Sequence, residues 1–143
     1  MPYRYLEDVA TADVAFEAWG ASLEELFTAA ADATMNVMVE DLATIEKKEE
    51  RSFQVEDEAV DMLLFKFLQE LIFYKDAQLL LLRIQSVTID RQNAHLSLTA
   101  TSYGEQLNPE KHSLNVDVKA VTLHRFRVEQ TDRGWEASVI LDI

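Results

Sequence analysis

The sequence contains no cysteine, only three glycines and two prolines, and half as many basic as acidic residues. The absence of cysteine excludes disulfides, thiolate metal sites and thiol nucleophiles, and it is typical of a reducing compartment. The scarcity of glycine and proline, with a hydrophobic share of 48%, indicates a compact chain with short loops. We therefore expect residues 1–143 to form one domain.

Long apolar runs are also missing. No uninterrupted run of apolar residues approaches the roughly 20 needed to cross a bilayer. The first residues are polar and aromatic, without the apolar stretch of a secretory signal. The sequence therefore predicts a cytoplasmic protein that does not enter a membrane.

Positive charge is scarce, with 13 basic residues against 26 acidic ones and a net charge of −13. Binding to a phosphate backbone depends on basic side chains that displace counterions, so this composition argues against direct binding to RNA or DNA. The same charge would favour cations or a basic protein surface. It can equally serve solubility alone.

Two helices stand out from the periodicity. Ser22 and Glu25 have the spacing of a capping box, and the apolar residues after them predict a helix over about 23–38. A second apolar stripe follows the i, i+3, i+4, i+7 pattern, with Asp57 as its expected cap. Its members are Val60, Leu63, Leu64, Phe67, Leu68, Leu71 and Ile72.

The rest of the chain has the pattern of strands. Short β-like segments are expected over 3–7, 14–19 and 51–55, and longer ones over about 79–91, 94–103, 115–130 and 135–142. Residues 91–93 and 132–134 are typical hairpin turns. We expect an α+β fold, with two helices packed on a mostly antiparallel sheet or sandwich of about six to seven strands.

Ionisable residues within three strand-like patches are the candidates for a functional site. Asp13, Lys119 and Asp142 each lie among residues that favour strands, and Ile143 adds an α-carboxylate directly after Asp142. Such oxygen donors suit a hard cation. Simpler interpretations also hold: Asp13 could cap a turn, Asp142 could lie in a frayed end, and Lys119 could be a surface lysine.

These patches resemble the archeases, small accessory proteins of the RtcB-type RNA ligase. The similar segments follow the same order along almost the whole chain. They are Thr11–Val14, Trp19–Gly20, Ser22–Phe27, Leu68–Ile72, Asp76, Gly104–Glu105, Lys111–His112, Val118–Thr122, His124 and Asp142–Ile143. The combination of Val118–Thr122 with His124 and a final Asp-aliphatic pair is the most specific part.

The resemblance implies a protein that is not an enzyme itself. It implies a divalent-cation site at Asp13, Asp142 and Ile143, holding Ca²⁺ or else Mn²⁺ or Mg²⁺. It also implies promotion of ligase guanylylation and multiple turnover in tRNA splicing or RNA repair. Lys119 and His124 are candidates for supporting this site or contacting the ligase, although His124 could be only a structural hydrogen-bonding residue.

The sequence departs from the family pattern at two positions. Ala10 and Lys75 stand where archeases often have histidine. This suggests either that those histidines are not essential ligands or that the site of this protein has fewer nitrogen donors. Two other functions remain open. A metal-dependent phosphohydrolase could use the acidic site with His124 as base, although the sequence lacks a phosphate loop and paired histidine ligands. A chaperone-like protein-binding module is the other alternative.

Overall fold

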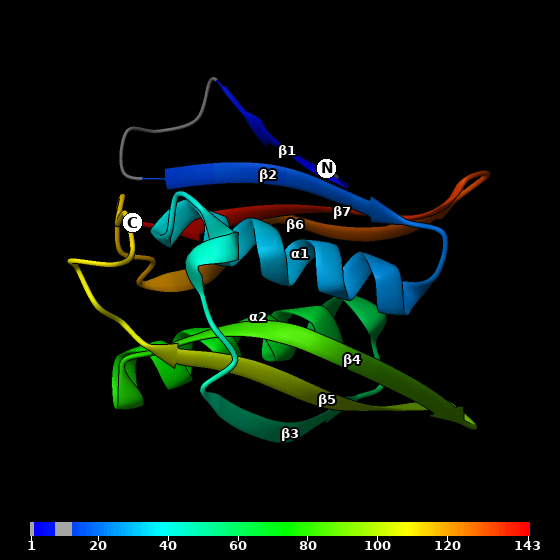
Figure 1. Cartoon of the computed structure of the whole chain (residues 1–143). Helices are drawn as coiled ribbons and strands as arrows, with labels where there is room; N and C mark the ends of the chain where they lie inside the picture. Colours follow the sequence, from blue (N-terminus) through cyan, green and yellow to red (C-terminus); the bar gives the residue numbers. More distant parts are fainter. Residues whose placement is uncertain (1, 8–12) are drawn as a thin grey trace.

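The computed structural model describes residues 2–7 and 13–143 of the chain (Figure 1). The first half contains β1 (Tyr3–Leu6), β2 (Asp13–Gly20), α1 (Leu23–Met38), a short 3-10 helix η1 (Leu42–Thr44), β3 (Glu49–Asp57) and α2 (Val60–Gln78). The second half contains β4 (Leu80–Gln92), β5 (His95–Gln106), β6 (Ala120–Thr131) and β7 (Gly134–Asp142). The α+β class expected from the sequence is confirmed.

The strands within these residues form two antiparallel sheets with the helices between them. One sheet has four strands in the order β1-β2-β7-β6, and the other has three in the order β3-β5-β4. Figure 1 shows the four-stranded sheet above the helices and the three-stranded sheet below them. Each helix contacts strands of both sheets. The hydrophobic core therefore lies between the two sheets, around the helices. The outer face of each sheet points away from this core.

The capping box places the start of α1. The Glu25 amide donates to the Ser22 hydroxyl oxygen at 3.1 Å, and the Glu25 carboxylate accepts from the Ala21 amide at 2.7 Å. Small residues then let the helix fit between two sheets. Four alanines of α1 are almost fully buried, namely Ala29, Ala30, Ala31 and Ala33.

The second helix differs from the prediction in its N-cap residue. Its N-cap is Ala59, not Asp57, and Asp57 instead accepts from the Ala59 amide at 2.9 Å, just outside the helix. The helix continues past Lys75 to Gln78 and ends at Leu79, whose φ of 55° is left-handed. None of the described helices is long and apolar enough to span a membrane.

The expected strand over 115–130 is wrong in its first part. Residues 115–119 are not in a strand, and β6 begins at Ala120. The reason lies in the partner strand: Ala120 pairs with Asp142, and β7 ends there. A strand needs a neighbour for its backbone hydrogen bonds, so the residues before Ala120 have no strand beyond Asp142 to pair with.

Candidate metal centre

Asp13 and Asp142 lie directly opposite each other at one end of the four-stranded sheet. Asp13 is the first residue of β2, Asp142 is the last of β7, and the antiparallel register pairs the two. Side chains of opposed residues lie on the same face, with Cβ atoms about 4.5–5.5 Å apart. Both residues are half-buried. Residues from distant parts of the sequence thus place two carboxylates side by side.

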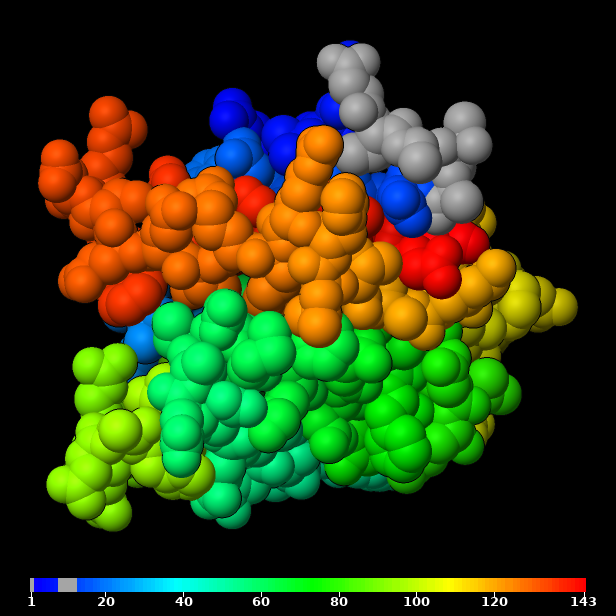
Figure 2. Space-filling model, turned by 180° about the vertical axis from the view of Figure 1, so that it is seen from behind, coloured from blue at the N-terminus to red at the C-terminus, as the bar shows by residue number. Residues whose placement is uncertain are grey.

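The strand alternation puts this pair on the face that points away from the helices. Phe16 and Ala18 are fully buried against the helical layer, so Asp13 lies on the opposite face. In Figure 2 the red C-terminal residues reach the surface beside the orange β6. The two carboxylates are therefore placed where a solvated ion or a partner could reach them.

The start of β6 closes the site on its other side. Ala120 lies opposite Asp142, and the Lys119 amide donates to the Asp142 carbonyl oxygen at 2.8 Å. This bond occupies the main chain of Asp142 and leaves its carboxylate available. The side chain of Lys119 is exposed. Lys119 thus belongs to the site through its backbone.

Helix α2 holds this segment in place through a buried lysine. Lys75 is 4% exposed, and its ammonium donates to the Val118 carbonyl oxygen at 2.8 Å and to Asp117 at 2.5 Å. It also forms an ion pair with Asp76 at 2.6 Å. Burial lowers the pKa of Lys75, but these two aspartates outweigh it and raise the pKa above its ordinary value. The lysine is therefore charged at neutral pH.

A second residue of α2 holds the start of β6 in place. The Gln69 side-chain oxygen accepts from the Val121 amide at 2.9 Å. The sequence analysis did not identify Gln69 or Lys75 as supports of the site. The spacing of Lys75 could have shown its role, because it follows Leu68 and Leu71 on the apolar stripe by seven and four residues. A lysine on a buried stripe requires acidic or carbonyl partners.

His124 is not brought to the aspartate pair. It lies in an irregular part of β6, where the pairing with β7 shifts between Thr122 and Arg127, and its side chain is exposed. The last regular pair before this shift is Thr122 with Ile140, two residues along β7 from Asp142, and His124 lies beyond it. The structure therefore groups Asp13 with Asp142 and the Lys119 backbone, and leaves His124 apart.

The donor chemistry of this centre suits a hard, hydrated cation. Carboxylate oxygens are the preferred ligands of Mg²⁺, Mn²⁺ and Ca²⁺. Within residues 2–7 and 13–143, no group of three or more histidines, cysteines, aspartates or glutamates is placed to hold an ion. Asp13 and Asp142 are the two carboxylates that the strand register brings together here, and Ile143 follows Asp142 directly in the chain. Residues 10–12 of the first sequence patch lie outside the described residues.

The comparison with known proteins decides the family. Residues 3–143 match the sequence model of the Archease protein family (MTH1598/TM1083). The chain belongs to the archease family. It is 40% identical over 134 residues to the protein archease of Pyrococcus abyssi, which covers 93% of this chain and 94% of the relative. The archease of Methanothermobacter thermautotrophicus is 39% identical over 133 residues, with the same coverage of both chains.

Two solved structures share the fold. The solution structure of Methanobacterium thermoautotrophicum protein 1598 covers 99% of each chain at a TM-score of 0.85 and 36% identity. The crystal structure of an archease from Thermotoga maritima, described as a possible chaperone, covers 94% of this chain and 93% of its own. Its TM-score is 0.60 at 20% identity, which supports the fold alone. The resemblance drawn from the sequence motifs is confirmed.

Proposed function

We propose that this archease is an accessory protein that activates an RtcB-type RNA ligase and is not an enzyme itself. The observation that carries the proposal is the direct opposition of Asp13 and Asp142 on the outer face of the sheet. Two adjacent carboxylates repel each other, so an arrangement of this kind is favoured when a cation lies between them. The family resemblance supplies the ligase as partner and tRNA splicing or RNA repair as the process.

The proposed ion is divalent and bound by Asp13, Asp142 and Ile143. When bound, it would supply positive charge for the phosphates of a nucleotidyl transfer on the ligase. The chain's own contribution is positioning. Lys75 and the Asp142 carbonyl hold residues 118–119 against the site, so the carboxylates are presented from a rigid sheet end. Mg²⁺ or Mn²⁺, which keep several waters, suit this small set, and Ca²⁺ would draw further oxygens from water or the ligase.

The surface charge supports a protein partner more than a nucleic acid. A net charge of −13 repels a phosphate backbone and speeds encounter with a basic protein surface. Lys119 is the exposed basic residue next to the site. We place it at the edge of the ligase contact, where its ammonium would face acidic groups or phosphates of the complex.

The decisive experiment is a time course of guanylylation of the host's own ligase, with GTP and Mn²⁺, with and without this protein. The parent protein should speed guanylylation and permit repeated turnover. Asp13→Asn and Asp142→Asn should lose this stimulation while retaining the parent's circular dichroism spectrum. Glu129→Gln is the matched control, because Glu129 lies opposite Glu136 in the same sheet but away from the site. Equal stimulation by all variants would exclude the proposed role of the carboxylates.

A chaperone-like role is the second candidate, favoured by the description of the Thermotoga maritima archease as a possible chaperone. It predicts protection of unrelated client proteins against aggregation, independent of Asp13 and of divalent ions. Turnover of phosphodiester or nucleotide substrates by the protein alone with Mn²⁺ would instead favour a hydrolase. Neither activity is expected if the ligase is the partner.

A further inference from the structure

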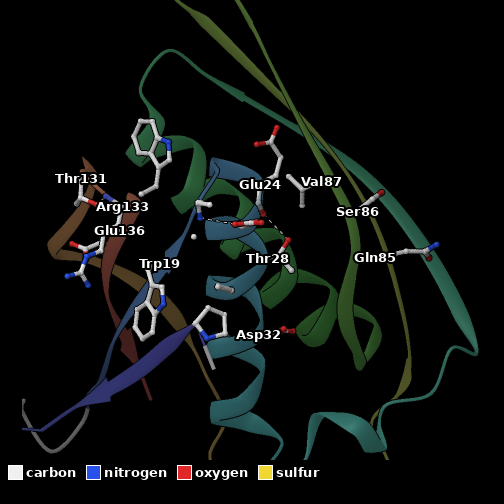
Figure 3. Close-up of a pocket in the computed structure, with 16 residues that line it drawn as sticks. Trp19, Glu24, Thr28, Asp32, Gln85, Ser86, Val87, Thr131, Arg133 and Glu136 are labelled. Carbon is white, nitrogen blue, oxygen red and sulfur yellow. Dashed lines mark hydrogen bonds between the residues drawn. The ribbon is translucent and has the colours of Figure 1, made fainter.

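A trough of about 730 Å³ lies at the opposite end of β2 from Asp13. One face of α1 forms its floor, where Glu24, Thr28 and Asp32 follow one another at four-residue intervals (Figure 3). Figure 3 shows Gln85, Ser86 and Val87 of β4 on one side of this helix. The volume is within the range of about 300–1,000 Å³ that is typical of small-molecule sites.

The other wall contains both tryptophans of the chain. Trp135 is paired with Gly20, on the face of the sheet that points to α1, and is half-buried. Trp19 is the neighbour of Gly20 in β2, so its side chain lies on the outer face of the sheet and reaches only the rim of the trough, with 40% exposure. Its amide donates to the Pro2 carbonyl oxygen at 2.9 Å. Aromatic surface of this kind binds apolar groups and attracts cations to the ring faces.

The charges of the trough favour a cation. Its lining includes four acidic residues, Glu24, Glu25, Asp32 and Glu136, and a single basic residue, Arg133. Asp32 is partly neutralised by Arg83 at 3.2 Å. Within the described part of the chain, neither Glu24 nor Glu136 forms an ion pair, and Glu25 accepts from the Ala21 amide. Glu136 is opposite Trp19 on the outer face of the sheet, so its charge lies at the rim of the trough. An excess of negative charge therefore surrounds an apolar, aromatic space.

We propose that this trough binds a linear aliphatic polyamine. Glu24 and Asp32 are eight residues apart on the helix, which corresponds to about 12 Å along its axis. Between them lies Thr28, and Val87 and Trp135 supply apolar lining beside the helix. A molecule with ammonium groups joined by short methylene segments matches this alternation of carboxylates and apolar surface. Asp32 keeps acceptor capacity beside Arg83, because a carboxylate offers about four lone-pair sites.

The polyamine site is separate from the proposed metal centre. Trp19 is six residues along β2 from Asp13, which corresponds to about 20 Å of extended strand. Binding at the trough therefore does not require the aspartate pair or the ligase. A polyamine here would tie the α1 start, the β6–β7 hairpin and β4 together, and should raise the stability of the fold.

Titration with spermidine at about 0.15 M salt tests the proposal, followed by tryptophan fluorescence and by calorimetry. Since both tryptophans line the trough, their emission reports occupancy directly. We expect a saturable, single-site change. Glu24→Gln combined with Glu136→Gln should weaken binding about fivefold, since each removes one exposed charge contact. The matched control combines Glu58→Gln with Glu110→Gln, two exposed acids outside the trough, and should bind as the parent does.

A second variant guards against effects on the helix start. Ser86→Lys places an ammonium in the trough from an exposed position of β4 and should compete with spermidine. Gln92→Lys adds the same charge at the far end of β4 and should not. A change that never saturates, or equal losses in the trough and control variants, would overturn the proposal. So would a lysine-rich peptide that displaces spermidine at a lower concentration, since the site would then serve a protein partner.

Discussion

The ammonium of Lys75, in helix α2, donates to the carbonyl oxygen of Val118 at 2.8 Å, and this bond ties the helical layer to the strand end that carries the candidate metal centre. Lys75 is the only lysine among the described residues that is almost fully buried. A buried lysine of the helical layer thus holds the chain next to Lys119.

Lys75→Met keeps the length of the side chain but removes its three donors. The Val118 carbonyl oxygen then loses its partner, so we expect the free energy of unfolding to fall by about 1–3 kcal/mol. Asp76 and Asp117 are more than half exposed and can be solvated, which limits the loss. Urea unfolding followed by circular dichroism measures the difference.

Lys66→Met is the matched control, because Lys66 lies on the same helix but is half exposed and pairs with Asp57. Its loss should cost less than about 1 kcal/mol, as is usual for surface ion pairs. Equal costs for the two lysines would show that the buried position of Lys75 adds nothing.

The buried carboxylate of Glu105 and the groups around it predict how the stability of the fold depends on pH. Glu105 is 5% exposed, and burial raises the pKa of its carboxyl, but hydrogen bonds from Lys111 and the Glu46 amide, together with His112 at 3.4 Å, lower it to about 2. The ordinary value is 4.5. Because the folded state has the lower pKa, this stabilisation is complete above about pH 4.5 and is lost as the pH falls toward 2.

Glu105→Gln should therefore unfold at a lower temperature than the parent at pH 7, and the two should converge near pH 2. Thermal unfolding measured between pH 7 and pH 2 tests this. Other carboxylates also titrate in this range, so the difference between the two proteins is the informative quantity. A difference that stays constant across the range would mean that the charge of Glu105 does not stabilise the fold.

Local signals in the sequence were enough to predict α1. Ser22 and Glu25 fix its start through contacts within four residues, so nothing distant is needed to see them. The role of Lys75 near the end of α2 was harder to predict. Lys75 and Asp76 have the composition of a helix end, and the contact of Lys75 with Asp117, far along the chain, is visible only in the structure.

The strand-like patches made Asp13 and Asp142 separate candidates, but their grouping in one site was anticipated through the family resemblance. Nothing in the periodicity near Asp13 indicates that Asp142 will be its strand partner, because that pairing depends on how β2 and β7 meet. The false strand over 115–119 has the same origin. Leu114, Val116 and Val118 alternate as a strand does, but pairing ends where β7 ends, and no local pattern shows that.

Gly104 is a position where the close approach of two strands excludes a side chain. A Cβ atom there would lie 1.8 Å from the Leu81 carbonyl oxygen, which belongs to the backbone of β4. Gly104→Ala should therefore cost more than about 2 kcal/mol or prevent folding, because the backbone must move. Thr99→Ala, at an exposed position of the same strand, should change stability by about 0.5 kcal/mol or less. Similar effects in urea unfolding would contradict the close approach.

The opposed pair of Asp13 and Asp142 predicts that the effect of Asp13→Asn on stability changes sign when a divalent metal ion is added. Without divalent ions, Asp13→Asn should stabilise the protein by about 0.2–1 kcal/mol, because it relieves the repulsion between two directly opposed carboxylates. With excess Mn²⁺, the parent gains binding energy that the variant lacks, and the order should reverse. Thermal unfolding in EDTA and in a series of Mn²⁺ concentrations measures both effects.

Glu129→Gln separates this effect from general surface charge. Glu129 also lies opposite an acid, Glu136, but it forms an ion pair with Arg127 at 2.8 Å. A positive charge therefore already lies beside Glu129. The difference in stability between Glu129→Gln and the parent should be the same with and without Mn²⁺. If Asp13→Asn behaved in this way too, the opposed aspartates would not form a metal centre, and their repulsion would have to be offset within the chain itself.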